Sequence, residues 1–183
     1  MHRPDLSDPA QRTLGSVLRH QAERIPDELF VQAGQGRYSY GRVDELANAW
    51  AAGLRDLGVG QGDTVAFFLR SGPEFVFATF GAMKLGAIWV PTNVDYKGEW
   101  LRGSLADSRA RVLVVDADLI PRVAEAAGDL PLAHAVVRGD GEVGALGCPV
   151  TPVAEIEDRK AAEPEALEIG PGDTAAVLWT SGT

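Results

Sequence analysis

The sequence has one cysteine, Cys148, in 183 residues. A single cysteine excludes an intrachain disulfide and a thiolate metal cluster, and this composition is typical of a reducing compartment. Cys148 stands between a glycine and a proline with no adjacent base, so we expect no catalytic thiol. The histidines His2, His20 and His134 have no ligand spacing to one another or to an acid pair, so we assign no metal site.

Basic residues are also few. The chain has 17 lysines and arginines against 26 aspartates and glutamates, which gives a formal net charge of −9. This charge repels polyanions at long range. We therefore expect neither a nucleic acid nor an anionic membrane as the main partner, although a local basic pocket for phosphates stays compatible with the composition.

A long uninterrupted apolar run is missing as well. The first nine residues contain acids and prolines where a secretory signal needs an apolar segment. The densest apolar stretch, residues 75–91, is interrupted by Lys84 and by glycines, which is typical of a buried helix, turn and strand. The sequence therefore predicts a cytoplasmic protein without a membrane span.

Hydrophobic periodicity predicts helices and strands in alternation. Apolar residues at helical spacing predict helices after a Thr13 cap, from a Ser39 cap to Leu57, and over residues 74–85, 97–108, 119–127 and 153–162. Short apolar runs predict strands at residues 64–69, 87–91, 112–115, 133–137 and 175–179. Residues 138–149 are expected to form a surface loop and residues 163–173 an acidic connector.

A hairpin is expected before this alternation, because residues 29–33 and 37–39 flank a tight glycine turn. The alternation itself predicts an α/β fold with a mostly parallel sheet and helices on both faces. We expect residues 1–12 to be an N-terminal tail and residues 13–183 to belong to one domain.

One glycine pattern matches a dinucleotide fingerprint by its letters. Gly139, Gly141 and Gly144 follow a predicted strand. The two acids between them would oppose the charge of a pyrophosphate, and the glycine and proline that follow prevent the long helix that holds the phosphates. We interpret the segment as a polar loop, which disfavours an NAD-dependent oxidoreductase.

The last four residues, Thr180-Ser181-Gly182-Thr183, directly follow the predicted strand 175–179. Small hydroxyl residues and glycine allow a sharp turn that aims several backbone N–H groups at one anion. Such residues are also common in ordinary turns, and the segment is not a Walker A loop because no Gly-Lys-Ser/Thr is present. The tetrapeptide alone leaves both interpretations open.

Three segments in order resemble the N-terminal domain of the adenylate-forming superfamily, which includes acyl-CoA synthetases, luciferases and the adenylation domains of peptide synthetases. Residues 58–66, G-V-G-Q-G-D-T-V-A, are similar to the family's G-V-x-x-G-D-x-V-A. Residues 84–93, K-L-G-A-I-W-V-P-T-N, are similar to K-x-G-A-x-x-V-P-x-N. Residues 176–183, A-V-L-W-T-S-G-T, resemble the first half of the family's phosphate-binding loop.

The resemblance implies an ATP-dependent acyl-CoA ligase. A carboxylate would attack the α-phosphate of Mg–ATP to give an acyl-adenylate and pyrophosphate, and the CoA thiol would then displace AMP. The resemblance further implies that Thr180, Ser181, Gly182 and Thr183 hold the β- and γ-phosphates. ATP, Mg²⁺ and CoA are the implied cofactors, and no catalytic residue is assigned.

The resemblance also implies that residues 13–183 are an incomplete AMP-binding domain, cut within the phosphate-binding loop. We therefore expect the encoded protein to be longer and the 183 residues alone to be inactive. Asn93 with residues 97–101, K-G-E-W-L, is most similar to fatty-acid or carnitine/crotonobetaine CoA ligases, which implies a fatty or related carboxylic acid as substrate.

Several alternatives stay open. A degenerate or half-reaction relative would bind nucleotide or acyl-adenylate without adenylating an acid. The final acceptor is CoA, a carrier protein or oxygen, and a homodimer is one of the association states that the sequence allows.

Overall fold

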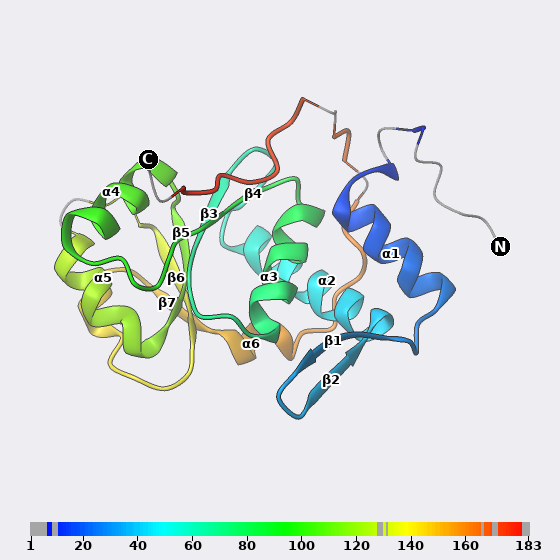
Figure 1. Cartoon of the computed structure of the whole chain (residues 1–183), viewed down its shortest axis with the longest axis horizontal. Helices are drawn as coiled ribbons and strands as arrows, with labels where there is room; N and C mark the ends of the chain where they lie inside the picture. The colour runs from blue at the N-terminus through cyan, green and yellow to red at the C-terminus, as the bar shows by residue number, and fades with distance from the viewer. Residues whose placement is uncertain are drawn as a thin grey trace.

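The computed structural model of the chain describes residues 7–8, 11–127, 130, 132–165, 167–169 and 172–180. Its centre is a five-stranded sheet in the order β4-β3-β5-β6-β7, with every neighbouring pair parallel. Figure 1 shows helices on both sides of this sheet, which confirms the predicted α/β fold. The strands are β3 (Thr64–Phe68), β4 (Ile88–Pro91), β5 (Val112–Asp116), β6 (His134–Arg138) and β7 (Val150–Pro152).

Each face of the sheet has its own hydrophobic core, because side chains alternate along a strand. Val65 and Phe67 of β3 belong to one core, while Ala66 and Phe68 belong to the other, and all four are fully buried. The first core contains residues of α1 (Leu14–Arg24), α2 (Tyr40–Asp56), α3 (Pro73–Lys84) and α6 (Val153–Glu157). The second contains residues of α4 (Gly98–Ser108) and α5 (Ile120–Ala127), with the 3₁₀ turns η2 (Ala117–Leu119) and η3 (Gly144–Leu146).

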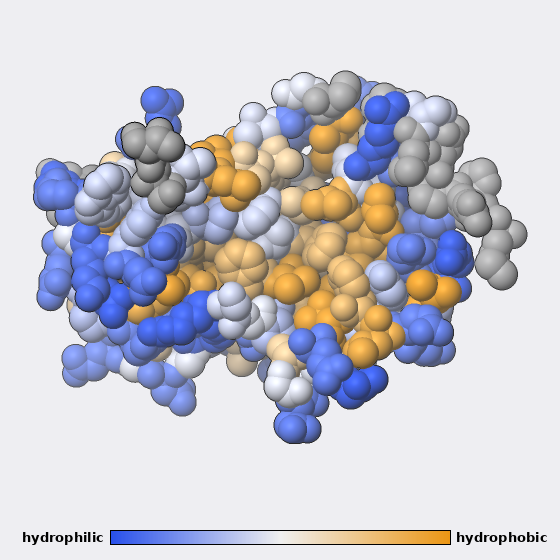
Figure 2. All heavy atoms as spheres, viewed as in Figure 1, coloured by the Kyte–Doolittle hydropathy of each residue, from blue (hydrophilic) through white to orange (hydrophobic). Residues whose placement is uncertain are grey.

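The predicted hairpin is present outside the sheet as the antiparallel pair β1 (Leu29–Ala33) and β2 (Gly36–Ser39). Its aromatic side chains pack on α3: the ring centroids of Tyr38 and Phe77 are 5.0 Å apart, and those of Phe30 and Phe80 are 5.9 Å apart. Figure 2 shows apolar side chains gathered on the face of the molecule that carries α3 and this hairpin. The outer side of α3 is thus only partly buried by the hairpin.

The predicted caps of α1 and α2 are present. Thr13 Oγ1 accepts a hydrogen bond from the Ser16 amide at 3.2 Å, and Ser39 Oγ accepts one from the Arg42 amide at 3.3 Å. These bonds satisfy amides at the helix N-termini that have no partner within the helix. Gly58, just beyond α2, has a φ of +84°, a conformation that glycine adopts at little cost.

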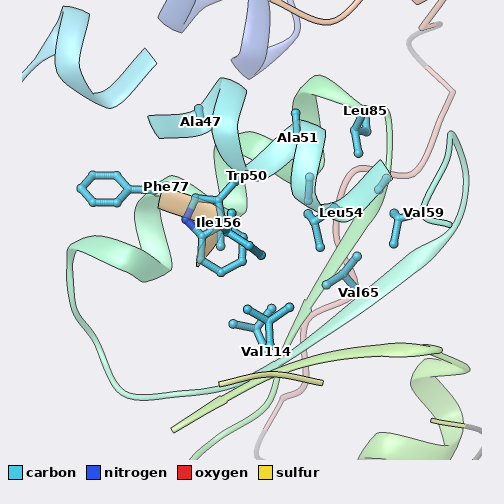
Figure 3. Packing of buried hydrophobic residues seen from close by; sticks show 14 of the residues in the cluster. Ala47, Trp50, Ala51, Leu54, Val59, Val65, Phe77, Leu85, Val114 and Ile156 are labelled. Carbon is cyan, nitrogen blue, oxygen red and sulfur yellow. The ribbon is translucent and has the colours of Figure 1, made fainter. Parts of the chain in front are cut away.

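Trp50 lies at the centre of the first core. Its side chain is fully buried in the core that also contains Phe77 of α3 and Ile156 of α6 (Figure 3). The indole N–H donates to Glu157 Oε1 at 3.0 Å, which links α2 to α6. Gly81 allows α3 to approach this side chain, because a Cβ at that position would lie 2.5 Å from Trp50 Cβ.

The chain between β6 and the acidic connector differs from the prediction in two ways. Residues 150–152 form the edge strand β7, which was not predicted because it is short and contains Pro152, a residue unsuited to central strands. Helix α6 ends at Glu157 and not at residue 162. No large apolar residue follows Ile156 until Leu167, so a longer helix would bury no further core surface. Among the described helices, none has the length and apolar character needed to cross a membrane.

Candidate functional site

The carboxyl ends of the parallel strands meet at one edge of the sheet. In open α/β sheets, ligands bind outside these ends, at the point where the strand order reverses. Here the reversal lies between β3 and β5, because the chain goes from β3 to β4 on one side and then returns to β5 on the other. The residues that follow these strands therefore decide whether a ligand can enter.

An ion-pair network lies at the carboxyl ends of β3, β5 and β6. Asp116 accepts hydrogen bonds from the Arg70 amide at 2.8 Å and from Arg138 Nε at 2.6 Å. Arg138 also donates to Glu74 at 2.9 Å, and Arg70 donates to both carboxylate oxygens of Asp118 at 2.7 and 2.8 Å. Burial lowers the pKa of Arg138, but its hydrogen bonds with Asp116 and Glu74 outweigh burial and leave that pKa raised. The arginines and carboxylates at this place are therefore paired with one another.

The carboxyl end of β4, on the other side of β3, opens into a cavity of about 840 Å³. Its walls come from the end of β4, the turn that leads to α4, and the segment near the end of the described chain. The lining residues are Pro91, Thr92, Asn93, Asp95, Tyr96, Lys97, Trp100, Leu178, Trp179 and Thr180. This cavity is the candidate functional site.

Backbone pairing with β4 brings the last described segment into this wall. Trp89 N donates to the Ala175 carbonyl at 3.2 Å, and Val177 N donates to the Trp89 carbonyl at 3.2 Å. The contact is one isolated parallel bridge between Trp89 and Ala176 and not the predicted strand 175–179. One bridge at a sheet edge orders fewer residues than a full ladder of backbone hydrogen bonds. Leu178, two residues beyond Ala176, is 63% exposed and lines the cavity.

The four residues predicted to bind phosphate are only partly within the described structure. Thr180 lines the cavity and is exposed. Ser181, Gly182 and Thr183 lie outside the described residues. The phosphate-binding role of all four therefore stays a prediction, and what the structure adds is that Thr180 lies beside the carboxyl end of β4.

Two further residues of the cavity wall were missed by the sequence analysis. Thr92 Oγ1 and Trp179 Nε1 are both buried and have no hydrogen-bond partner among the residues that the structure describes. Asn93 Oδ1, by contrast, accepts from the Asp95 amide at 2.9 Å and fixes the turn before α4. Thr92 and Trp179 lie within segments 84–93 and 176–183, but nothing local marks their polar atoms as unpaired.

The connector that leads into the bridge is held by a buried lysine of α3. Lys84 Nζ donates to Asp44 at 2.8 Å, to Asn48 at 2.6 Å and to Glu163 at 2.5 Å, and its side chain is only 1% exposed. Burial raises the pKa of Asp44, although Lys84 acts in the opposite direction. This cluster fixes Glu163, and with it the start of the connector, against α2 and α3.

The glycine pattern after β6 does not form a nucleotide site. Gly144 begins the three-residue turn η3, so no long helix follows it. A Cβ at Gly141 would lie 3.0 Å from Ala117 Cβ, which shows that this glycine packs against the chain after β5. The structure thus agrees with the interpretation of the segment as a loop. Within the described residues, no group of three or more His, Cys, Asp or Glu side chains could hold a metal ion.

The candidate site is thus a cavity at the carboxyl end of β4 in a parallel sheet. The first residue of a Thr/Ser/Gly segment, Thr180, lies in its wall. The model of the AMP-binding enzyme family matches residues 18–183 of this sequence. The chain belongs to that family. Its AMP-binding fold, with the mostly parallel sheet described above, matches the N-terminal part of solved CoA ligases.

Similar proteins include several CoA ligases. The medium/long-chain-fatty-acid–CoA ligase FadD6 of Mycobacterium tuberculosis is 32% identical over 95% of this chain and 28% of that protein. The crotonobetaine/carnitine–CoA ligase of Salmonella arizonae is 35% identical over 80% of this chain and 28% of that protein. The crystal structure of the anthranilate CoA ligase AuaEII with anthranoyl-AMP matches with a TM-score of 0.86 and 26% identity, over 96% of this chain and 33% of that one. This chain therefore spans about a third of the length of these relatives.

Proposed function

We propose that this AMP-binding chain is the N-terminal part of an ATP-dependent acyl-CoA ligase. Residues 13–183 would form the incomplete AMP-binding domain, interrupted in the phosphate-binding loop. The observation that carries the proposal is the position of Thr180. The segment that resembles the family's phosphate-binding loop begins in the wall of the cavity at the carboxyl end of β4, which is the sheet edge where α/β proteins bind ligands.

The reaction would proceed in two steps. A carboxylate oxygen of the acid attacks the α-phosphorus of ATP, and the bond to the β-phosphate oxygen breaks, which gives an acyl-adenylate and pyrophosphate. The CoA thiol, after losing its proton, then attacks the acyl carbon and releases AMP. The protein would mainly align these charged groups and neutralise their charge.

In the first step, the N–H and hydroxyl groups of Thr180, Ser181, Gly182 and Thr183 would hold the β- and γ-phosphates. Backbone amides of small residues suit this task, because they approach an anion closely from several directions. Mg²⁺ is usually bound through substrate phosphates together with one or two carboxylates. Asp95 is the one acid among the residues that line the described cavity, so the nucleotide's own oxygens would carry most of the metal coordination.

We propose a fatty or related carboxylic acid as the substrate. The relatives described above act on medium- and long-chain fatty acids, on crotonobetaine or carnitine, and on anthranilate, as their names state. Exposed Leu178 and Trp100 give the cavity an apolar part that suits the hydrocarbon portion of such an acid. The common element of these substrates is the carboxylate.

A product analysis tests the proposed function. The protein in its full encoded length would be incubated with Mg–ATP, CoA and a panel of fatty, aryl and quaternary-ammonium carboxylic acids, and the products would be followed by mass spectrometry. We expect one acid class to give acyl-CoA with an equal amount of AMP. Nucleotide binding without AMP or pyrophosphate formation from any acid would refute a ligase and identify a nucleotide-binding relative.

A further inference from the structure

Thr92 occupies an unusual position at the end of β4. Its backbone is fixed by the sheet, because Thr92 N donates to the Phe67 carbonyl of β3 at 2.8 Å. The residue is 5% exposed, yet its hydroxyl has no hydrogen-bond partner in the described part of the chain. Native proteins rarely leave a buried hydroxyl unpaired, because the group loses its hydrogen bonds to water without replacement. The hydroxyl therefore points to a partner that is not among the described residues.

Trp179 is in the same situation and lines the same cavity. Its indole N–H is buried without a partner in the described residues. A second tryptophan with a buried, unpaired indole N–H, Trp89, is different, because its ring packs into the core against Phe67 and Phe75 and does not line the cavity. The isolated bridge between Trp89 and Ala176 holds the segments of Thr92 and Trp179 side by side.

The chemistry of these two groups defines the partner. An indole N–H can only donate, and a threonine hydroxyl can donate as well. One acceptor oxygen, or two oxygens of one group, would therefore satisfy both. Lys97 lines the cavity and makes no ion pair with a described carboxylate, which favours an anion, while Asp95 on the same wall opposes an excess of negative charge. A single anionic group with exposed oxygens fits this arrangement.

We propose that Thr92 and Trp179 form an oxyanion subsite at the carboxyl end of β4. The subsite binds one or two oxygens of a reactant's phosphate or carboxylate through the Thr92 hydroxyl and the Trp179 indole N–H. The inference rests on the proposed function, since it places a reactant in the same cavity. It adds two binding residues that lie outside the predicted tetrapeptide.

Binding measurements on matched variants test the subsite. Thr92→Val removes the hydroxyl and keeps the shape of the side chain, whereas Thr92→Ser keeps the hydroxyl. Trp179→Phe removes the indole N–H and keeps an aromatic ring. The dissociation constants of Mg–ATP, CoA and octanoate would be measured by titration calorimetry on the full-length protein and these variants, with thermal unfolding as the check on folding.

We expect Thr92→Val to raise the dissociation constant of one of these ligands about 10- to 100-fold, which is the usual effect of losing a hydrogen bond to a charged group. Thr92→Ser should stay within about twofold of the wild type, and Trp179→Phe should weaken the same ligand. An effect on Mg–ATP or CoA identifies a phosphate oxygen, and an effect on octanoate identifies a carboxylate oxygen.

Three results would overturn the subsite. One is equal affinity of Thr92→Val and Thr92→Ser for all three ligands. Another is a lower unfolding temperature of Thr92→Val with unchanged affinities, because the hydroxyl would then pair with another part of the protein. The third is that the wild type binds none of the ligands. Failure of the proposed function is distinct, because it is a failure of the wild type to form AMP and pyrophosphate.

Discussion

Gly81 is the residue on which the close approach of α3 to α2 depends. In Gly81→Ala, the added methyl carbon would lie 2.5 Å from Trp50 Cβ and 3.0 Å from the Ala47 carbonyl oxygen. Overpacking of this kind costs about 1–3 kcal/mol, and replacing a helical glycine by alanine recovers at most about 1 kcal/mol. We expect Gly81→Ala to lower the free energy of unfolding by about 1–2 kcal/mol in urea denaturation.

Gly103 provides the matched control. It lies inside α4, and a Cβ at this position would have no neighbouring atom within 4 Å. Gly103→Ala should therefore raise the free energy of unfolding, by up to about 1 kcal/mol, because only the helical preference of alanine acts. Equal effects of the two substitutions would contradict the packing described for α2 and α3.

Lys84 is the second residue whose loss has a specific consequence. Lys84→Met would leave Asp44 and Glu163 without their shared cation, and breaking a buried ion pair in this way costs about 3–5 kcal/mol. Both carboxylates are partly exposed, and water would stabilise them in part. We therefore expect Lys84→Met to lower the free energy of unfolding by about 2–3 kcal/mol. Arg42→Met, which removes the exposed partner of Glu45, should change stability by less than about 0.5 kcal/mol.

The deficit of Lys84→Met should depend on pH. The pKa of Asp44 is raised by burial, so its protonation favours the folded state at pH values below the unfolded pKa near 3.8, and this contribution disappears as pH rises through the folded pKa. Without Lys84 the folded pKa should rise further, because the lysine lowers it. Lowering the pH from 7 to 4.5 should therefore increase the stabilising contribution of Asp44 protonation in both proteins, and more so in Lys84→Met, so denaturation should show a smaller Lys84→Met deficit at the lower pH. A larger deficit at the lower pH would refute this assignment.

The N-termini of α1 and α2 were predictable, because a helix cap depends only on residues close together in the sequence. Thr13 and Ser39 each cap a helix through an amide three residues ahead. Ser39→Ala should cost about 1 kcal/mol of unfolding free energy, whereas Ser39→Asp should cost little, because an aspartate accepts the same bond and suits the positive end of the helix. Chemical denaturation of the two variants measures the difference, and equal stabilities would show that Ser39 does not act as a cap.

Elements whose existence depends on distant partners were harder to predict. The three residues of β7 form a strand because β6 is beside them, and Pro152 weakens the local strand signal. Residues 175–179 have a strand sequence but meet β4 at a single bridge. Local propensity thus indicated a strand where pairing is minimal and missed one where a neighbour supplies it.

At the scale of the whole molecule, the alternation of helices and strands was sufficient to predict the parallel α/β fold. The order of the strands was not predictable, since it depends on which edges pair across the sheet. Asp116 pairs with Arg70, which is 46 positions away in the sequence, and with Arg138, which is 22 positions away. No local sequence pattern predicts this network. The predicted phosphate-binding residues came from resemblance, and Thr92 became a candidate only through the burial of its hydroxyl.

The acid-dependent exchange of pyrophosphate into ATP, measured on the full-length protein without CoA, shows whether the protein activates a carboxylic acid as an acyl-adenylate. Exchange requires a reversible first step in which a carboxylate displaces pyrophosphate. We predict exchange that depends on the acid, and a loss of about 10-fold or more when Thr180 is replaced by valine, because the proposed phosphate contact of Thr180 would be removed. Binding of Mg–ATP with no exchange for any acid would contradict the account.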